Sequence, residues 1–139
     1  MICSMKSKSL QHARTCVFNV NYHLVWSTKY RRKVLTGTIA EYLESLCRTI
    51  GVEKGFDVKD VQVMPDHVHS FVSAHPKVAP GYIYKMLKGI SARRMFMKYP
   101  TLKGALHRGH LWNTSTYVET VGHVSEEAIR RYIEEQKTK

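Results

Sequence analysis

Residues 57–73 of the chain read DVKDVQVMPDHVHSFVS. Two runs rich in valine, residues 57–64 and 67–73, lie on either side of Pro65-Asp66. β-Branched residues favour strands, and a Pro-Asp pair favours a turn. This stretch therefore predicts two strands in hairpin relation, with Asp66 as a turn residue. If the second strand already began at Asp66, its side chain would point to the face opposite His67.

Upstream of this hairpin, the sequence predicts a strand and then a helix. In residues 16–27 apolar side chains alternate as in a half-buried strand, and the apolar face is Phe18, Val20, Tyr22, Leu24 and Trp26. Thr38 and Glu41 stand three apart as a capping box, so a helix should begin at Thr38. Gly51 or Gly55 can end this helix, and its buried stripe is Ile39, Leu43, Leu46, Cys47 and Ile50.

Downstream, Pro80 suits the first turn of a second helix, which runs to about Lys98 before Pro100. The apolar stripe of this helix is Ile83, Met86, Leu87, Ile90 and Met97. Residues 101–111 predict a loop, and residues 112–121, rich in Thr, Tyr and Val, predict a fourth strand. Ser125 can cap a last helix.

The expected order of elements is β-α-β-β-α-β followed by a terminal helix. This is an α+β, ferredoxin-like arrangement, in which helices cover one face of an antiparallel sheet. We interpret residues 16–139 as a single domain and the basic residues 1–15 as a flexible N-terminal arm. RNA-binding RRM domains share this arrangement, so the fold alone does not decide the function.

The charge of the chain indicates a polyanionic partner. Among 139 residues there are 22 Lys and Arg against 11 Asp and Glu, a formal net charge of +11. Nucleic acid is the most abundant polyanion, although lysines can also serve solubility alone. The candidate phosphate contacts are Lys29, Arg31, Arg32, Lys33, Lys85, Lys88, Arg93 and Arg94.

Composition narrows the class of protein further. A hydrophobic share of 43% with 24% charged residues is typical of a globular domain and excludes a disordered chain. No apolar run approaches the ~20 residues of a membrane helix, and no signal peptide is visible. Three widely spaced cysteines form no disulfide framework, which favours a reducing cytoplasm. Because no apolar run is long enough, we expect no membrane partner. We also see no nucleotide-binding loop, so we expect no nucleotide cofactor.

Two pairs of residues carry candidate chemistry. His67 and His69 are two apart on a predicted strand, so their imidazoles point to the same face and can converge on one ion. Tyr132 and Gln136 are four apart on the predicted last helix and share a helix face. Taken singly, each pair has a plainer interpretation: strand histidines without a ligand, and a tyrosine that packs in the core.

Taken together, the two pairs describe a divalent-metal site beside a nucleophile. Two imidazoles and an amide oxygen are neutral ligands, so the ion would keep its full charge and could polarise a phosphate oxygen strongly. Tyr132 would be aimed at the same place as a nucleophile.

Four stretches resemble a known family. They are YHLVWSTKYRRKVL from Tyr22, VQVMPDHVHSFV from Val61, LWNTSTYVETVG from Leu111, and the closing pair Tyr132 and Gln136. In this order they resemble the HUH-type single-tyrosine transposases, the TnpA-type enzymes of insertion sequences that move as single-stranded DNA. The resemblance covers about residues 17–137, and PDHVH followed by a helical Y-x-x-x-Q is specific as a pair.

The resemblance implies a metal-dependent DNA strand transferase. His67, His69 and Gln136 would hold the metal, and Tyr132 would attack the scissile phosphate to form a 5′-phosphotyrosine and a free 3′-OH. The family acts as homodimers on single-stranded DNA and recognises subterminal hairpins at the element ends.

Some alternatives stay open. The resemblance implies Mg²⁺, with Mn²⁺ able to substitute, whereas two imidazoles suit manganese or zinc better on softness grounds. A non-catalytic RRM-like module that binds single-stranded nucleic acid would fit the fold and the charge, although RRMs display aromatic residues on the central strands. A host-adopted relative that processes chromosomal palindromes would keep the same catalytic centre.

Overall fold

The computed structural model describes residues 11–12, 17–18, 20–106, 109–121, 131 and 134–135. The strands are β1 (Gln11–His12), β2 (Val17–Phe18), β3 (Asn21–Ser27), β4 (Asp57–Met64), β5 (His67–Ser73) and β6 (Tyr117–Val121). The helices are α1 (Gly37–Lys54), α2 (Pro80–Lys98) and α3 (Thr101–Ala105), and a short 3₁₀ turn, η1, lies at Lys29–Arg31.

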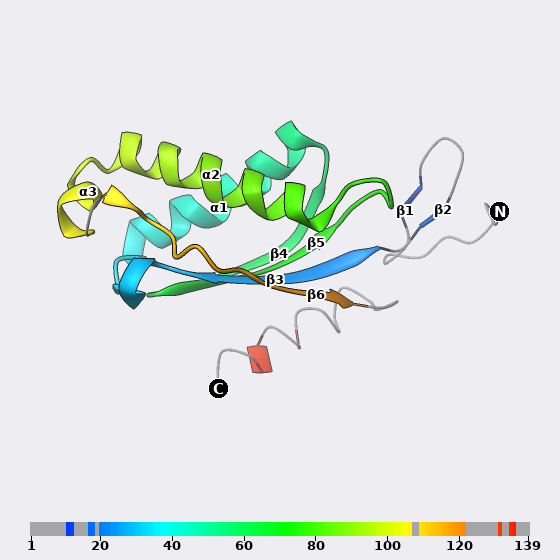
Figure 1. Ribbon diagram of the computed structural model, residues 1–139, viewed down its shortest axis with the longest axis horizontal. Coiled ribbons are helices and arrows are strands. Elements are labelled where there is room, and N and C mark those ends of the chain that lie inside the picture. The colour runs from blue at the N-terminus through cyan, green and yellow to red at the C-terminus, as the bar shows by residue number, and fades with distance from the viewer. Residues whose placement is uncertain are drawn as a thin grey trace.

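The main sheet has four antiparallel strands in the order β4-β5-β3-β6. Helices α1 and α2 both lie on one face of this sheet (Figure 1). The predicted α+β, ferredoxin-like arrangement is thereby confirmed. The terminal helix is confirmed in part, because residues 131, 134 and 135 are helical while its predicted cap, Ser125, lies outside the described residues.

A hydrophobic core fills the space between the sheet and the two helices. Alternate residues of the central strands point into it, among them Leu24 and Trp26 of β3 and Val68 and Val72 of β5. The helices contribute Leu43, Leu46, Cys47, Ile50, Ile83, Leu87, Ile90 and Met95. Full burial of one such large apolar side chain contributes about 1.5–3 kcal/mol, so this layer holds the sheet firmly from one side.

Several predicted bounds are confirmed. The strands at 57–64 and 67–73 and the helix at 80–98 begin and end where the sequence predicted them. Helix α1 ends at Gly55, one of the two glycines predicted to end it, and Gly55 adopts the left-handed conformation that glycine tolerates (φ 87°). Proline and glycine act locally, which is why sequence alone located these ends.

The strand predicted from residue 16 begins only at Asn21. Asn21 is the partner of Ser73, the last residue of β5, so the ladder ends where its neighbour ends. Val17–Phe18 pair instead with Gln11–His12 in a small separate sheet. Alternation of apolar residues could not show this exchange of partners.

The strand predicted from Trp112 begins only at Tyr117. Trp112 makes an isolated bridge to Thr28, and the segment that follows it bends away. The ammonium of Lys88 on α2 donates hydrogen bonds to the carbonyl oxygens of residues 113, 114 and 115 at 2.8, 3.4 and 3.2 Å, which ties this segment to α2.

Three smaller predictions were also wrong. Helix α1 begins at Gly37 rather than Thr38, because the chain enters it through a left-handed glycine (φ 57°) and no side chain caps it. The predicted loop at 101–111 contains α3, which buries Leu102. Met97 is 74% exposed, and Met95 takes the buried position on α2.

Candidate active site

His67 and His69 lie side by side on β5. Their ring centroids are 5.0 Å apart, as expected for residues that share a face of a strand. They pair across the sheet with Ser27 and Val25 of β3, so they lie on the face opposite Trp26 and Leu24, which point into the core. The sequence predicted this convergence, and the structure brings the two imidazoles together on the face that α1 and α2 do not cover.

Asp66 lies in the turn before β5, as predicted, and its carboxylate orients His67. The strand has not begun at Asp66, whose Oδ1 accepts a hydrogen bond from Nδ1 of His67 at 2.6 Å. Its Oδ2 accepts a second bond from Nε of Arg31 at 3.2 Å. Burial raises the pKa of Asp66, but the bond from His67 and the charge of Arg31 outweigh it and hold the pKa below its usual value.

A strained turn places Arg31 beside Asp66. Tyr30 and Arg31 have φ values of 58° and 55°, in the left-handed region that residues other than glycine seldom adopt. The hydroxyl of Thr28, just before this turn, donates a hydrogen bond to the carbonyl oxygen of Arg32 at 2.7 Å. The turn therefore places a guanidinium beside the carboxylate that touches His67.

His69 has a different neighbour, His23 of β3. Nδ1 of His69 and Nε2 of His23 are 3.2 Å apart, and Nδ1 of His23 is 3.4 Å from Oε1 of Glu119 on β6. The hydroxyl of Tyr117 donates to the other oxygen of Glu119 at 2.8 Å. Burial lowers the pKa of His23, and the hydrogen bond and charge of Glu119 oppose this effect.

Sequence reasoning missed His23 and Glu119. His23 falls on the polar face of the strand predicted at residues 16–27, where the alternation predicts exposure, yet only 1% of it is exposed. The stretch YHLVW contains the histidine, but nothing in the sequence shows that Glu119 lies opposite it across the β3–β6 pair.

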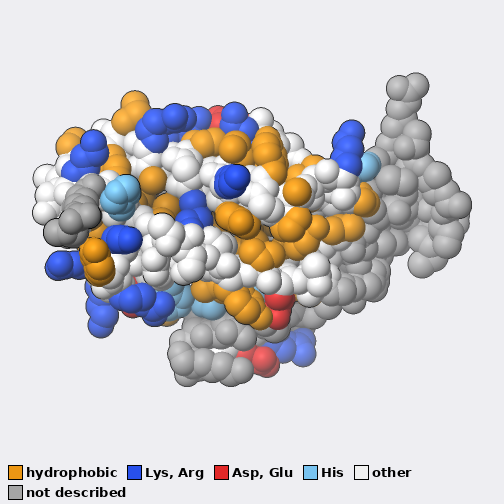
Figure 2. Space-filling view, viewed as in Figure 1, with side chains coloured by type: hydrophobic (Ala, Val, Ile, Leu, Met, Phe, Trp, Pro, Cys, Tyr) orange, Lys and Arg blue, Asp and Glu red, His pale blue; other side chains and the backbone are white. Residues whose placement is uncertain are grey.

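The structure divides the predicted DNA contacts into two groups. Lys29, Arg31, Arg32 and Lys33 lie on or beside η1, which follows β3 directly and reaches Asp66. Lys85, Lys88, Arg93 and Arg94 lie on α2, on the far side of the sheet from the histidine pair. Lys and Arg side chains gather along the helices and at one end of the molecule in Figure 2.

Within the second group, two cations already have partners inside the protein. Arg94 pairs with Glu53 at 2.9 Å, and Lys88 has oxygen partners in residues 113–116. Burial lowers the pKa of Lys88. Contacts of all eight residues with DNA stay predictions.

Tyr132 and Gln136 lie outside the described residues. Their described neighbours Arg131, Glu134 and Glu135 are helical. The segment with Glu134 and Glu135 lies on the side of the sheet away from α1 and α2, which is the side of His67 and His69 (Figure 1).

The two imidazoles suit a divalent cation by their chemistry. Nδ1 of His67 donates to the Asp66 carboxylate, so the lone pair of His67 for a metal belongs to Nε2. Nδ1 of His69 lies within hydrogen-bond distance of His23. Among the described residues there is no group of three or more His, Cys, Asp and Glu side chains that could hold a metal. The predicted third ligand, Gln136, is beyond them.

Comparisons with known proteins identify the family. The family model described as "Transposase IS200 like" matches residues 16–136, nearly the whole chain. The chain belongs to the IS200-like transposase family. Its membership indicates DNA strand transfer in general.

Individual relatives agree with this assignment. The chain is 44% identical over 130 residues to the ISDra2 transposase TnpA of Deinococcus radiodurans, covering 94% of this chain and 93% of that protein. It is 29% identical to the transposase for insertion sequence element IS200 of Salmonella typhimurium, covering 94% and 86%.

Solved structures show the same fold. A crystal structure of a candidate transposase from Deinococcus radiodurans R1 superposes with a TM-score of 0.75 at 40% identity, covering 91% of this chain and 97% of that one. A REP-associated tyrosine transposase bound to a REP hairpin has a TM-score of 0.54 at 13% identity, covering 88% and 67%, and shows likeness of fold alone.

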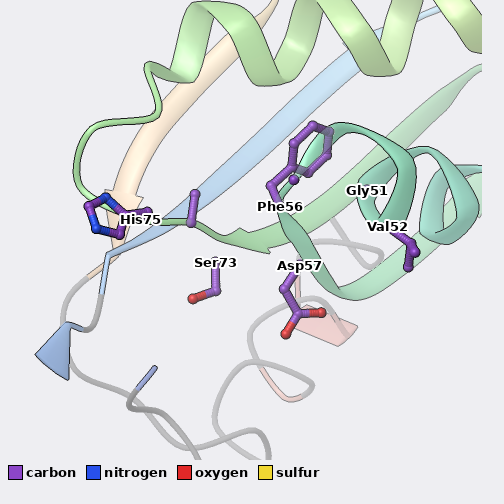
Figure 3. Close-up of a pocket in the computed structure, with 8 residues that line it drawn as sticks. Gly51, Val52, Phe56, Asp57, Ser73 and His75 are labelled. Carbon is purple, nitrogen blue, oxygen red and sulfur yellow. The ribbon is translucent and has the colours of Figure 1, made fainter. Parts of the chain in front are cut away.

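This IS200-like transposase also has a cavity that is separate from the histidine pair. The cavity of about 260 Å³ lies between the end of α1 and the end of β5, and its lining includes Gly51, Phe56, Asp57 and Ser73 (Figure 3). It lies at the Ser73 end of β5, whereas His67 is at the other end. Neither His67 nor His69 lines this cavity, so it is not part of the candidate active site.

None of the helices in the described part of the transposase combines the length and the apolar character needed to cross a lipid bilayer.

Proposed function

We propose that the chain cleaves and rejoins single-stranded DNA at the ends of an insertion sequence, with Tyr132 as nucleophile and a divalent metal ion as cofactor. The observation that carries this proposal is the pair His67 and His69, whose ring centroids lie 5.0 Å apart on one face of β5, so that both imidazoles can converge on one ion. The family assignment supports it.

In this proposal His67, His69 and Gln136 hold Mg²⁺, with Mn²⁺ able to substitute. A bound divalent ion supplies Lewis-acid polarisation of a phosphate oxygen. The Tyr132 oxygen attacks the phosphorus, one P–O bond forms to the tyrosine, and the P–O3′ bond breaks. The phenol of Tyr132 gives up one proton in this step and the departing 3′ oxygen takes up one, so the protons balance. One phosphodiester replaces another, so rejoining by the reverse reaction needs no nucleotide cofactor.

The proposed substrate is single-stranded DNA with subterminal hairpins, bound by a homodimer in the cytoplasm. The basic η1 turn is next to the histidine pair through Arg31 and Asp66, which suits contact with the phosphates near the scissile bond. The exposed cations of α2 would reach a different part of the DNA, because α2 covers the other face of the sheet.

An RRM-like binding module is the weaker alternative. RRM domains stack bases on exposed aromatic side chains of the central strands. On the corresponding face of β3 and β5, Phe71 is only 1% exposed and stacks against His23. A host-adopted relative that processes chromosomal palindromes differs only in its target, and the 44% identity to an insertion-sequence transposase favours the mobile element.

The test uses single-stranded oligonucleotides of the two segments that flank the gene, each with its imperfect palindrome. The full chain is incubated with them and Mg²⁺ or Mn²⁺, and covalent protein–DNA adducts are resolved on a denaturing gel. We expect an adduct with the wild type, none with Tyr132→Phe, and none in the presence of a chelator.

A matched control is Tyr82→Phe, which removes a hydroxyl that bonds the carbonyl of Lys54 on the helix side of the molecule. This variant should form the adduct as the wild type does. An adduct that survives Tyr132→Phe would remove the nucleophile from the proposal. DNA binding with neither adduct nor chelator sensitivity would favour the non-catalytic module.

A further inference from the structure

We propose that His23, Glu119 and Tyr117 form a positioning chain that holds His69 in the tautomer able to ligate a cation. The inference rests on the proposed function, because it concerns how His69 is prepared for the ion. This series of hydrogen-bonded side chains crosses three strands of the sheet, from β5 through the central β3 to β6.

The anionic carboxylate of Glu119 sets the direction of the hydrogen bonds in this positioning chain. The carboxylate of Glu119 can only accept hydrogen bonds, so it accepts one from the hydroxyl of Tyr117 and one from Nδ1–H of His23. With its proton on Nδ1, the neutral His23 ring has an acceptor at Nε2. Nδ1–H of His69 donates to this acceptor across 3.2 Å, and the lone pair of His69 is then on Nε2.

The opposite direction is disfavoured by the same contacts. If Nε2–H of His23 donated to His69, the neutral His23 would present an unprotonated Nδ1 to the carboxylate of Glu119. Two acceptors would then face each other at 3.4 Å in a part-buried place. Such a contact leaves the buried Nδ1 of His23 without a donor and is therefore unfavourable.

The ring of His23 is held in place as well as hydrogen-bonded. It is 1% exposed and stacks on Phe71 with centroids 4.9 Å apart and 12° between the planes. Tyr117 meets it edge-on at 6.2 Å. These contacts restrict rotation of the imidazole. The hydrogen bond to Glu119 therefore selects the tautomer of His23, and the tautomer of His23 selects that of His69.

The imidazole of His67 is oriented without an intervening residue, because it bonds directly to the carboxylate of Asp66. Each predicted ligand is thus tied to a carboxylate that comes from a separate element, the β4–β5 turn for His67 and β6 for His69. Loss of such outer partners typically weakens metal binding about 10–100-fold.

The decisive measurement is the position of the His69 ring proton in the metal-free, full-length protein. Ring-nitrogen NMR shifts distinguish the two tautomers without any catalysis. We expect the proton on Nδ1 in the wild type and a mixture of tautomers in Glu119→Ala. Mn²⁺ affinity, followed by electron paramagnetic resonance, should fall about tenfold in Glu119→Ala.

Two further variants separate positioning from folding. His23→Gln offers an amide oxygen that can accept from His69, so it should keep the Nδ1 tautomer and most of the Mn²⁺ affinity. Thr120→Ala changes the exposed neighbour of Glu119 on β6 and should match the wild type in both measurements.

The inference is overturned if His69 carries its proton on Nε2 in the wild type, or if Glu119→Ala changes neither the tautomer nor the affinity. If the wild type shows the expected tautomer but binds no Mn²⁺, the metal site of the proposed function fails while the positioning chain stands.

Discussion

At the scale of the residue, Cys47 shows how burial changes the chemistry of a side chain. This thiol has no exposed surface in α1, and burial raises its pKa to about 12. The thiolate is the reactive form, so the folded protein presents almost none of it near neutral pH.

We therefore expect iodoacetamide at pH 8 to alkylate Cys47 at least about 100-fold more slowly in the native protein than after unfolding in urea. Peptide mapping by mass spectrometry distinguishes Cys47 from Cys3 and Cys16. Because the folded pKa is raised, the contribution of this thiol to stability is intact below the unfolded pKa of ~8.5 and is lost as pH rises toward about 12. Rapid native labelling of Cys47 would contradict this account of the core.

At the scale of the element, the glycines of the two long helices have opposite roles. Gly51 lies inside α1 where the chain turns back to β4, and a Cβ there would be 2.7 Å from the carbonyl oxygen of Phe56 and 2.9 Å from Val58. Gly89 lies inside α2, and a Cβ there would meet nothing within 4 Å. The first glycine permits a close backbone approach, and the second only weakens its helix.

Alanine at the two positions should therefore shift stability in opposite directions. Gly89→Ala should raise the free energy of unfolding by about 0.5–1 kcal/mol, the ordinary gain in helix propensity. Gly51→Ala should lower it by about 1–3 kcal/mol, because backbone must move to admit the methyl group. Urea denaturation measures both, and a stabilising Gly51→Ala would show that the α1–β4 connection is looser than described.

At the scale of the whole molecule, the net charge of +11 should dominate DNA binding. Binding to single-stranded DNA releases counterions, and log K falls with log[salt] by about 0.7 for each phosphate contacted. An exposed cation that contacts a phosphate contributes to this slope, whereas a cation held within the protein does not.

We expect Arg32→Gln and Arg93→Gln each to reduce the salt slope by about 0.7 when binding to the flanking-segment oligonucleotides is followed by fluorescence anisotropy. Both side chains are on exposed residues. Lys59→Gln is the control, since this ammonium pairs with Asp57 at 2.8 Å and is only 18% exposed. An equal change in all three slopes would mean that net charge alone, and no particular contact, governs binding.

The same scales explain how far sequence reasoning reached. Pro80, Gly55 and Pro65-Asp66 act on their own backbone, and the elements they delimit ended where predicted. The strand starts at Asn21 and Tyr117 depend on partners elsewhere in the chain, and sequence alone misplaced both. The spacing of His67 and His69 predicted that they meet, because two residues apart on any strand share a face.

The amino-acid sequence by itself determined the order of the elements, the positive charge and the pairing of the two histidines, since each follows from local periodicity or from counting. Only the tertiary structure decided that Asp66 touches His67 and that His23 links His69 to Glu119. The latter contacts join residues 46 and 96 positions apart in the chain. Their proximity arises from the pairing of β3 with β5 and β6, which depends on how the strands and helices pack together rather than on any local pattern.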